Sequence, residues 1–133
     1  MEAEARRRKT RQLALVLDAV LASGTEHPSA DGIFARVRAV LPTISLGTVY
    51  RNLHRLADEG RIGVLHLADR LARFDPTPGG HDHFVCEECG RIEDLPAAPL
   101  DAEANAARCA GHHVTGHALV LYGRCRACAA GAT

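Results

Sequence analysis

Two Cys-x-x-Cys pairs, Cys86 with Cys89 and Cys125 with Cys128, restrict the folds open to this chain more than any other feature. In a reducing compartment such pairs are typical of zinc ligands and not of disulfides. Four thiolates in this arrangement favour tetrahedral Zn²⁺. Because 35 residues lie between the two pairs, a shared ion would hold the end of the chain against an earlier hairpin. The fifth cysteine, Cys109, is interpreted as a small packed residue.

Histidines precede the first cysteine pair in the run His81-Asp-His-Phe-Val-Cys86. The Phe-Val pair favours a strand, in which His81 and His83 share one face and Cys86 points to the other. The imidazoles and the thiols are therefore expected to serve different metals. Imidazoles with carboxylates suit iron(II) or manganese(II), although zinc accepts them as well.

The chain is basic in its first part and acidic in its second. Residues 1–73 carry twelve Lys and Arg against eight Asp and Glu, and residues 74–133 carry four against eight. A basic segment suits a polyanion, and an acidic one rich in His and Cys suits cations. A run of prolines and glycines marks the boundary. We predict one domain over residues 1–76 and another over 81–133, joined by a hinge over 77–80.

Apolar residues recur at helical spacing in three segments of the basic part, residues 10–22, 29–41 and 45–59. Residues 61–67 and 71–75 have strand character and are joined by a tight turn. Three helices followed by a hairpin predict a winged helix-turn-helix domain. With a small α/β domain after it, the expected fold class is α+β.

The third helix carries the side chains expected to contact a nucleic acid. Its apolar stripe turns Tyr50, Arg51 and Arg55 outward at the spacing of a major-groove helix. For a helix taken alone, the alternative interpretation is a solvated charged face. The hairpin that follows favours DNA binding. Residues 1–9, which contain four Lys and Arg, either lie along a phosphate backbone or form a frayed, solvated start.

The acidic part is expected to form a small sheet with one helix. Residues 91–95 and 114–122 have strand patterns, and the Ala-rich residues 100–111 predict a helix. A sheet of so few strands leaves an edge that can pair with a second copy, so a homodimer is expected.

Length and hydropathy limit the setting. A chain of 133 residues, 47% of them hydrophobic, can bury one or two small cores. No charged start leads into an apolar segment, and Asp18 interrupts the apolar stretch over residues 13–22. Neither a signal peptide nor a membrane span is expected, and the predicted compartment is the cytoplasm.

Three motifs follow one another along the chain: SLGTVYRNL at residues 45–53, HDHFVCEECG at 81–90 and LYGRCRAC at 121–128. As a set they resemble the ferric uptake regulator (Fur) family of bacterial metal-dependent transcription factors, and the likeness extends over residues 10–128. The resemblance implies a winged helix that binds operator DNA, a carboxyl-terminal dimerisation domain and a regulatory metal between them. It implies a transcriptional repressor and not an enzyme.

The resemblance also implies two ligand sets. The structural Zn²⁺ falls on the four cysteines Cys86, Cys89, Cys125 and Cys128, and the regulatory Fe²⁺ or Mn²⁺, or Zn²⁺ instead, falls on His27, Asp75, His81, His83 and Asp94. Asp94 is selected over Glu93, which would face the other way on a strand. This composition resembles the peroxide-sensing (PerR) branch, in which His27 and His81 would be the oxidised ligands. An iron, manganese or zinc uptake regulator of the same family is the alternative.

The DNA-binding positions implied in this way are Lys9, Arg11, Thr48, Tyr50, Arg51 and Arg55. Leu13 stands where the family usually has Arg. A third, weak metal site would use Asp82, Asp101 and His117, but its remaining histidine falls on Gly80. Two other classes of function stay open. One is a zinc hydrolase with an acidic side chain as base, and the other is a zinc-stapled interaction module that binds no DNA.

Overall fold

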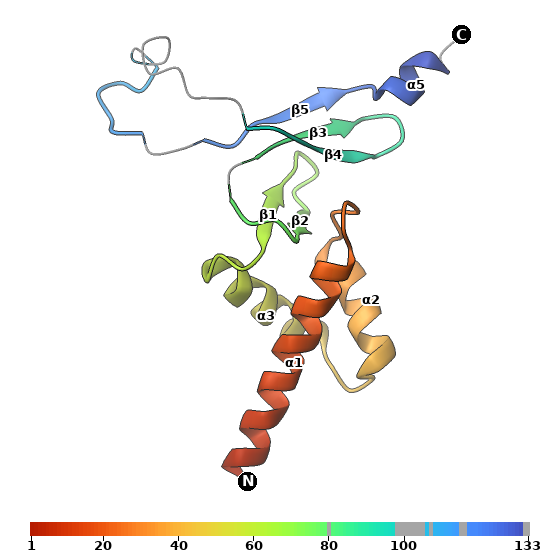
Figure 1. The fold of residues 1–133 in the computed structure, drawn as a ribbon, viewed down its shortest axis with the longest axis vertical. Helices are drawn as coiled ribbons and strands as arrows, with labels where there is room; N and C mark the ends of the chain where they lie inside the picture. The colour runs from red at the N-terminus through yellow and green to blue at the C-terminus, as the bar shows by residue number, and fades with distance from the viewer. Residues whose placement is uncertain (80, 98–105, 107, 115–116, 132–133) are drawn as a thin grey trace. The chain divides into compact units, whose positions relative to one another are not determined.

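A computed structural model describes residues 1–79, 81–97, 106, 108–114 and 117–131, and it divides the chain into two units, Met1–Gly79 and Gly80–Thr133. The first unit contains three helices and a two-stranded hairpin, and the second contains a three-stranded sheet and a short helix (Figure 1). The α+β fold class with a winged helix at its amino end is confirmed. No helix among the described residues is long and apolar enough to cross a membrane.

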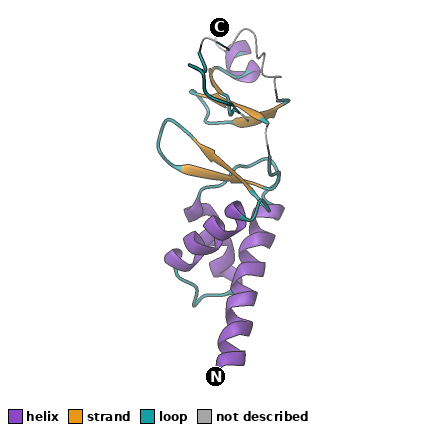
Figure 2. Ribbon diagram, turned by 90° about the vertical axis from the view of Figure 1, so that its left-hand side faces the viewer, coloured by secondary structure: helices purple, strands orange, loops and turns teal. Residues whose placement is uncertain are grey.

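The helices of the first unit are α1 (Glu2–Ala22), α2 (Ala30–Val40) and α3 (Leu46–Asp58). Serines begin the second and third, because Ser29 Oγ accepts from the Gly32 amide and Ser45 Oγ accepts from the Thr48 amide. The three helices pack on one another around a core that β2 also enters (Figure 2). That core contains Val16, Val20, Ile33, Val37, Val49, Leu53, Leu56, Ile62 and Phe74.

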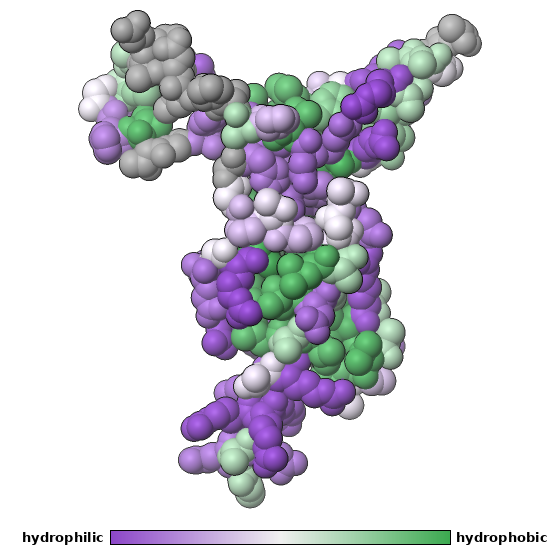
Figure 3. All heavy atoms as spheres, in the orientation of Figure 1, coloured by the Kyte–Doolittle hydropathy of each residue, from purple (hydrophilic) through white to green (hydrophobic). Residues whose placement is uncertain are grey.

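The frayed-start interpretation of residues 1–9 was wrong, and so was the expected helix start at Thr10. Helix α1 runs without a break from Glu2, and the Thr10 hydroxyl donates to the Arg6 carbonyl within the helix. Ala, Arg, Lys and Glu are strong helix formers, and acidic side chains in a first turn favour the positive end of the helix dipole. Hydrophilic side chains cover this end of α1 (Figure 3).

The hairpin pairs β1 (Gly63–His66) with β2 (Ala72–Asp75) in antiparallel register, Gly63 opposite Asp75. Its turn has Arg70 at φ 66°, and the Asp69 carboxylate accepts from the Leu71 amide. That amide lowers the pKa of Asp69. Strand β2 directs Phe74 into the helical core. The side chain that follows, Asp75, is therefore held at a fixed place at the end of the strand.

The second unit has the strand order β4–β3–β5, with β3 at Asp82–Cys86, β4 at Ile92–Leu95 and β5 at Val120–Gly123. Strand β4 lies within the predicted strand over residues 91–95 and is antiparallel to β3, whereas β5 is parallel to β3. A short helix, α5 (Arg126–Ala130), follows and was not predicted.

The second unit differs from the sequence predictions at its last strand and between residues 106 and 111. The last strand was predicted over residues 114–122, but it begins at Val120, because it extends only where it pairs with β3. Residue 114 and residues 117–119 lie outside any strand. The helix predicted over residues 100–111 falls largely outside the described residues, and residues 106 and 108–111 lie in turns.

Candidate metal centres and DNA-binding face

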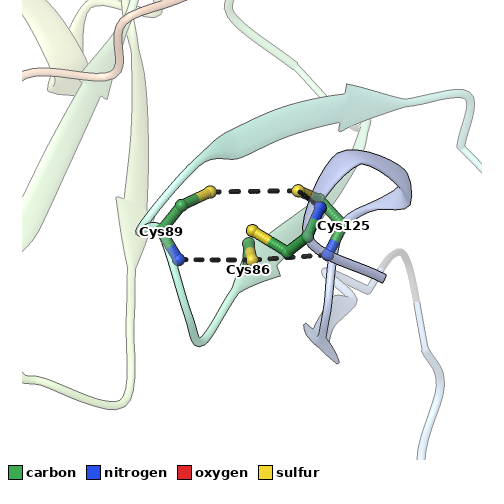
Figure 4. Close-up of side chains that lie close together, drawn as sticks. Cys86, Cys89 and Cys125 are labelled. Atoms are coloured by element: carbon green, nitrogen blue, oxygen red, sulfur yellow. Dashed lines mark hydrogen bonds between the residues drawn. The ribbon is translucent and has the colours of Figure 1, made fainter. Parts of the chain in front are cut away.

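The four cysteines of the two Cys-x-x-Cys pairs come together in the second unit. Cys86 ends β3, Cys89 lies in the turn that leads to β4, and Cys125 follows β5 and begins α5. Gly90, at φ 79°, allows the tight turn after Cys89. Because β3 and β5 run parallel, their carboxyl ends bring the two pairs to the same end of the sheet. Figure 4 shows three of the sulfurs directed toward one another.

The sulfur positions fit a tetrahedral ion. The four Sγ atoms all lie within 4.8 Å of one another, and Cys89 Sγ is 3.9 Å from Cys125 Sγ. Two sulfurs bound about 2.3 Å from one Zn²⁺ lie about 3.8 Å apart. The site therefore needs little rearrangement to hold zinc.

Backbone amides prepare these thiols for a cation. The amides of Cys89 and Cys125 donate to Cys86 Sγ over 3.4 and 3.3 Å, and they lower the pKa of Cys86 to about 6. The Cys128 amide donates to Cys125 Sγ and lowers the pKa of that thiol. Hydrogen bonding to Cys125 raises the pKa of Cys128 to about 12. Cys86 and Cys125 thus favour the thiolate form and Cys128 the thiol form. A bound cation would replace the remaining thiol protons.

Arginines support the cysteine cluster from outside. Arg124 donates to the Glu88 carboxylate over 2.9 Å and to the Cys128 carbonyl over 3.1 Å, so it links the two Cys-x-x-Cys turns. Arg126 binds both carboxylate oxygens of Glu93, at 2.9 and 3.1 Å. Both arginines are about half exposed or more, and their energetic contribution is therefore small, on the order of 1 kcal/mol or less per pair.

A different donor pair forms inside the first unit. His27 Nε2 lies 3.2 Å from Asp75 Oδ2, and both side chains are buried. The His27 loop is brought there because the Phe74 amide donates to the Pro28 carbonyl over 2.9 Å, next to the histidine. His27 itself has φ 53°, which is uncommon for a residue with a side chain.

Hydrogen bonds orient both donors of this pair. His27 Nδ1 is 2.8 Å from the Thr25 carbonyl, to which it can donate, and this leaves Nε2 facing the carboxylate. Asp75 Oδ1 accepts from the Thr77 amide over 2.8 Å, and this leaves Oδ2 facing the imidazole. A metal-ligating histidine is commonly held through its other ring nitrogen in this way.

Gly63 makes room for the turn that holds Asp75. A Cβ at Gly63 would lie 2.7 Å from the Thr77 carbonyl oxygen, closer than real contacts allow. We expect Gly63→Ala to displace this turn and to lower the free energy of unfolding of the first unit by about 1–3 kcal/mol. Urea denaturation followed by circular dichroism measures the change. Gly47→Ala is the matched control, since its Cβ would make only ordinary contacts with Arg51 and the capping Ser45, and we expect it to raise the free energy of unfolding by about 0.5–1 kcal/mol. Equal effects of the two substitutions would contradict the steric argument.

A third donor set forms inside the second unit. His83 lies opposite Asp94 in the β3–β4 register, and the His81 and His83 rings share one face with centroids 4.4 Å apart. Asp94 Oδ1 lies 3.3 Å from His81 Nε2 and 3.2 Å from His83 Nε2. The neighbouring Glu93 is directed instead to Arg126.

The spacing of these donors suits metal ligands. Nitrogen and oxygen atoms bound about 2.1 Å from one ion lie about 3.0–3.4 Å apart in octahedral or tetrahedral geometry. The separations of 3.2 Å in the first unit and 3.2–3.3 Å in the second fall in that range. Imidazole with carboxylate is a donor set that iron(II), manganese(II) and zinc all accept.

The third metal site expected at Asp82, Asp101 and His117 stays a prediction. Asp82 is buried in β3 opposite Leu95, whereas His117 is exposed. Asp101 lies outside the described residues.

The predicted DNA-binding residues lie on α1 and α3. A groove of about 380 Å³ runs between these helices, and it is lined by Arg8, Lys9, Gln12, Thr43, Thr48, Arg51, Asn52 and Arg55. Arg11 lines an adjoining hollow with Arg7 and Arg8. Tyr50 is exposed and stacks on His54, with ring centroids 6.4 Å apart. Sequence reasoning placed Arg8 in the basic run of residues 1–9 and missed Gln12, Thr43 and Asn52. Helical spacing from Arg8 would have revealed Gln12, had α1 been extended to Glu2.

Known proteins share both the sequence pattern and the fold of this chain. Residues 4–122 match the sequence pattern of the ferric uptake regulator family. The peroxide-responsive repressor PerR of Staphylococcus saprophyticus is 37% identical over 122 residues, which cover 91% of this chain and 82% of that protein. The peroxide operon regulator of Bacillus subtilis is 37% identical over 109 residues, 81% of this chain and 75% of that one. The crystal structure of the Campylobacter jejuni peroxide stress regulator superposes with a TM-score of 0.70 at 29% identity, over 96% of each chain. The chain therefore belongs to the ferric uptake regulator family.

Proposed function

We propose that the protein is a cytoplasmic, metal-dependent transcriptional repressor that binds operator DNA and senses peroxide through iron(II) or manganese(II). Family membership supports the repressor function, and the two relatives named for peroxide response support the signal. The observation that carries the proposal is the pair of incomplete donor sets. The first unit offers two donors, His27 and Asp75, and the second offers three, His81, His83 and Asp94.

Neither donor set is sufficient alone for a tight, selective site. Two donors leave most of the coordination sphere of iron(II) or manganese(II) to water, whereas the two sets together supply five ligands. We infer that one ion takes ligands from both units. Binding then favours the arrangement of the units in which all five side chains reach the metal.

That arrangement would govern DNA binding through a homodimer. In the strand order β4–β3–β5, both β4 and β5 are edges among the described strands, and an edge strand pairs readily with a second copy. In a dimer, the position of each first unit sets the separation of the two α3 helices, which must match half-sites on the duplex. Loss of the metal would release the operator.

Zinc is proposed for the cysteine cluster, where it would tie β3, β5 and α5 together. Its role there is structural, because all four donors are protein thiolates and no position is left for a substrate. An iron(II) ion at the other site, when bound, would supply the reactivity toward peroxide. The imidazole that is attacked exchanges a ring C–H bond for a C–O bond, and the peroxide is reduced to water.

Mass spectrometry of the metal-loaded protein tests peroxide sensing. We expect peroxide to add one oxygen atom to the peptides that contain His27 or His81 in the iron(II) form, and to leave the manganese(II) form unmodified. Binding to a duplex that the manganese-loaded protein selects from a random-sequence library should be lost in parallel with the modification. Metal-dependent binding without such oxidation would identify a sensor of the metal itself. No metal-dependent selection of any duplex would overturn the repressor proposal.

A further inference from the structure

The two arginines on the outer face of α3 are held by different partners. Arg51 Nη2 donates to the Thr48 hydroxyl over 3.0 Å, one turn toward the start of the helix. Arg55 Nε donates to the Glu59 carboxylate over 2.9 Å, one turn toward its end. The carboxylate offsets the charge of Arg55, whereas a hydroxyl leaves that of Arg51 undiminished. Of the two arginines, Arg51 is therefore the better suited to bind an anion.

Arg51 folds back over the first turn of α3. A Cβ built on Gly47 would lie 3.5 Å from Arg51 Nη1, and α3 begins at Leu46. A cation is disfavoured at this end of a helix, where the macrodipole is positive. The position of the guanidinium thus depends on a specific hydrogen bond, and the Thr48 hydroxyl provides it.

Thr48 is itself fixed in the orientation that this bond requires. Its hydroxyl lies 2.9 Å from Ser45 Oγ, which also accepts from the Thr48 amide over 3.1 Å. Arginine has donors only, so the Thr48 oxygen must accept from Arg51. The Thr48 hydroxyl proton is then directed to Ser45 Oγ. The chain of donors runs from Arg51 through Thr48 to the serine that caps the helix.

The held guanidinium lies at a groove suited to DNA. Arg51, Thr48 and Asn52 line it from α3, and Arg8, Lys9 and Gln12 line it from α1. Arginine and lysine bind phosphates and guanine edges, and side-chain amides bind adenine edges or the backbone. All of these residues belong to the first unit, so the groove does not depend on how the two units are arranged.

We propose that Thr48 is a positioning residue that orders Arg51 for DNA before the duplex arrives. The proposal rests on the DNA binding proposed above and names the side chain that prepares Arg51 for it. An arginine that is already ordered loses less side-chain entropy on binding. Thr48 acts through Arg51 and not by a contact of its own, so its effect must vanish when Arg51 is removed.

A double-mutant cycle on the manganese-loaded full chain tests this dependence. The probes are a duplex selected from a random-sequence library by the wild-type protein and a scrambled duplex of the same composition. Thr48→Val removes the hydroxyl while keeping the shape of the side chain, Thr48→Ser restores the hydroxyl, and Arg51→Ala removes the partner. Thermal unfolding and zinc content establish that each variant is folded.

We expect Thr48→Val to weaken binding to the selected duplex about fivefold, as the loss of one hydrogen bond implies, and Thr48→Ser to restore it. Arg51→Ala should weaken it tenfold or more, a loss of about 1.4 kcal/mol or more. In the Arg51→Ala background, Thr48→Val should have no further effect. A full additional loss in that background, or no loss in the wild-type background, overturns the proposal. If the wild-type protein selects no duplex, the proposed function fails instead.

Discussion

Cys86→Ser will leave the second unit unfolded, even when zinc is supplied. Cys86 is buried at the end of β3, and its sulfur accepts amide hydrogen bonds from both cysteine turns. A structural zinc site contributes about 10–16 kcal/mol of binding free energy that is realised only in the folded state. A small domain has a net stability of about 5–15 kcal/mol. Removing a central ligand therefore costs about as much free energy as the whole net stability of the unit.

Zinc content and limited proteolysis measure this result. Wild-type protein should retain zinc through dialysis against a mild chelator and should resist trypsin after Arg91 and Arg124. The variant should retain no zinc and be cleaved rapidly at both positions. Cys109→Ser is the matched control, because it makes the same chemical change outside the four-sulfur cluster and should retain zinc. A Cys86→Ser protein that stays zinc-free yet resists trypsin would contradict the structural role of the ion.

His83→Ala will abolish the dependence of DNA binding on manganese. Coupling between an effector and a ligand typically changes affinity about 5- to 150-fold, and in this proposal all of that factor depends on the five-ligand set. His83 is buried in β3 and lies opposite Asp94, so its removal leaves that carboxylate with His81 alone from the second unit. Two donors from one unit and two from the other no longer complete the site.

The affinity for the selected duplex, measured with manganese and again with a chelator, tests the prediction. The ratio of the two affinities should fall close to one in His83→Ala. His113→Ala is the matched control, because that histidine is exposed and lies outside both donor sets, and its ratio should equal that of the wild type. Zinc content should be the same in all three proteins. A normal ratio in His83→Ala would remove the basis for a metal held by both units.

Local patterns predicted the parts of the fold that depend on neighbouring residues. Alternation along β3 placed His81 and His83 on one face, and the structure brings their rings together there. Apolar stripes located α2 and α3. The start of α1 was not predicted, because an apolar stripe marks only the part of a helix that packs on the core. Before that part, the helix is maintained by residue propensity, which a search for buried positions does not detect.

Features that depend on residues far away in the sequence could not be predicted from local sequence patterns. The extent of β5 is set by its pairing with β3 from His83 to Cys86, so its own sequence pattern overstated its length. His27 is a loop residue whose neighbours give no sign of metal binding. It meets Asp75 only because the backbone beside it is hydrogen bonded to β2. The family resemblance predicted His27 as a metal ligand, and the geometry of the first unit explains its position.

The parallel pairing of β3 with β5 has a consequence for how the protein matures. Residues 1–79 contain every element of the first unit, so they can fold on the emerging nascent chain while translation continues. The second unit has to wait, because β3 gains its parallel neighbour β5, and the cysteine cluster its other two thiols, only after residue 128 has left the ribosome. A newly made molecule would thus pass through a stage in which α1 and α3 are already folded. At that stage its cysteines are not yet assembled into one site and can bind other thiophilic metal ions.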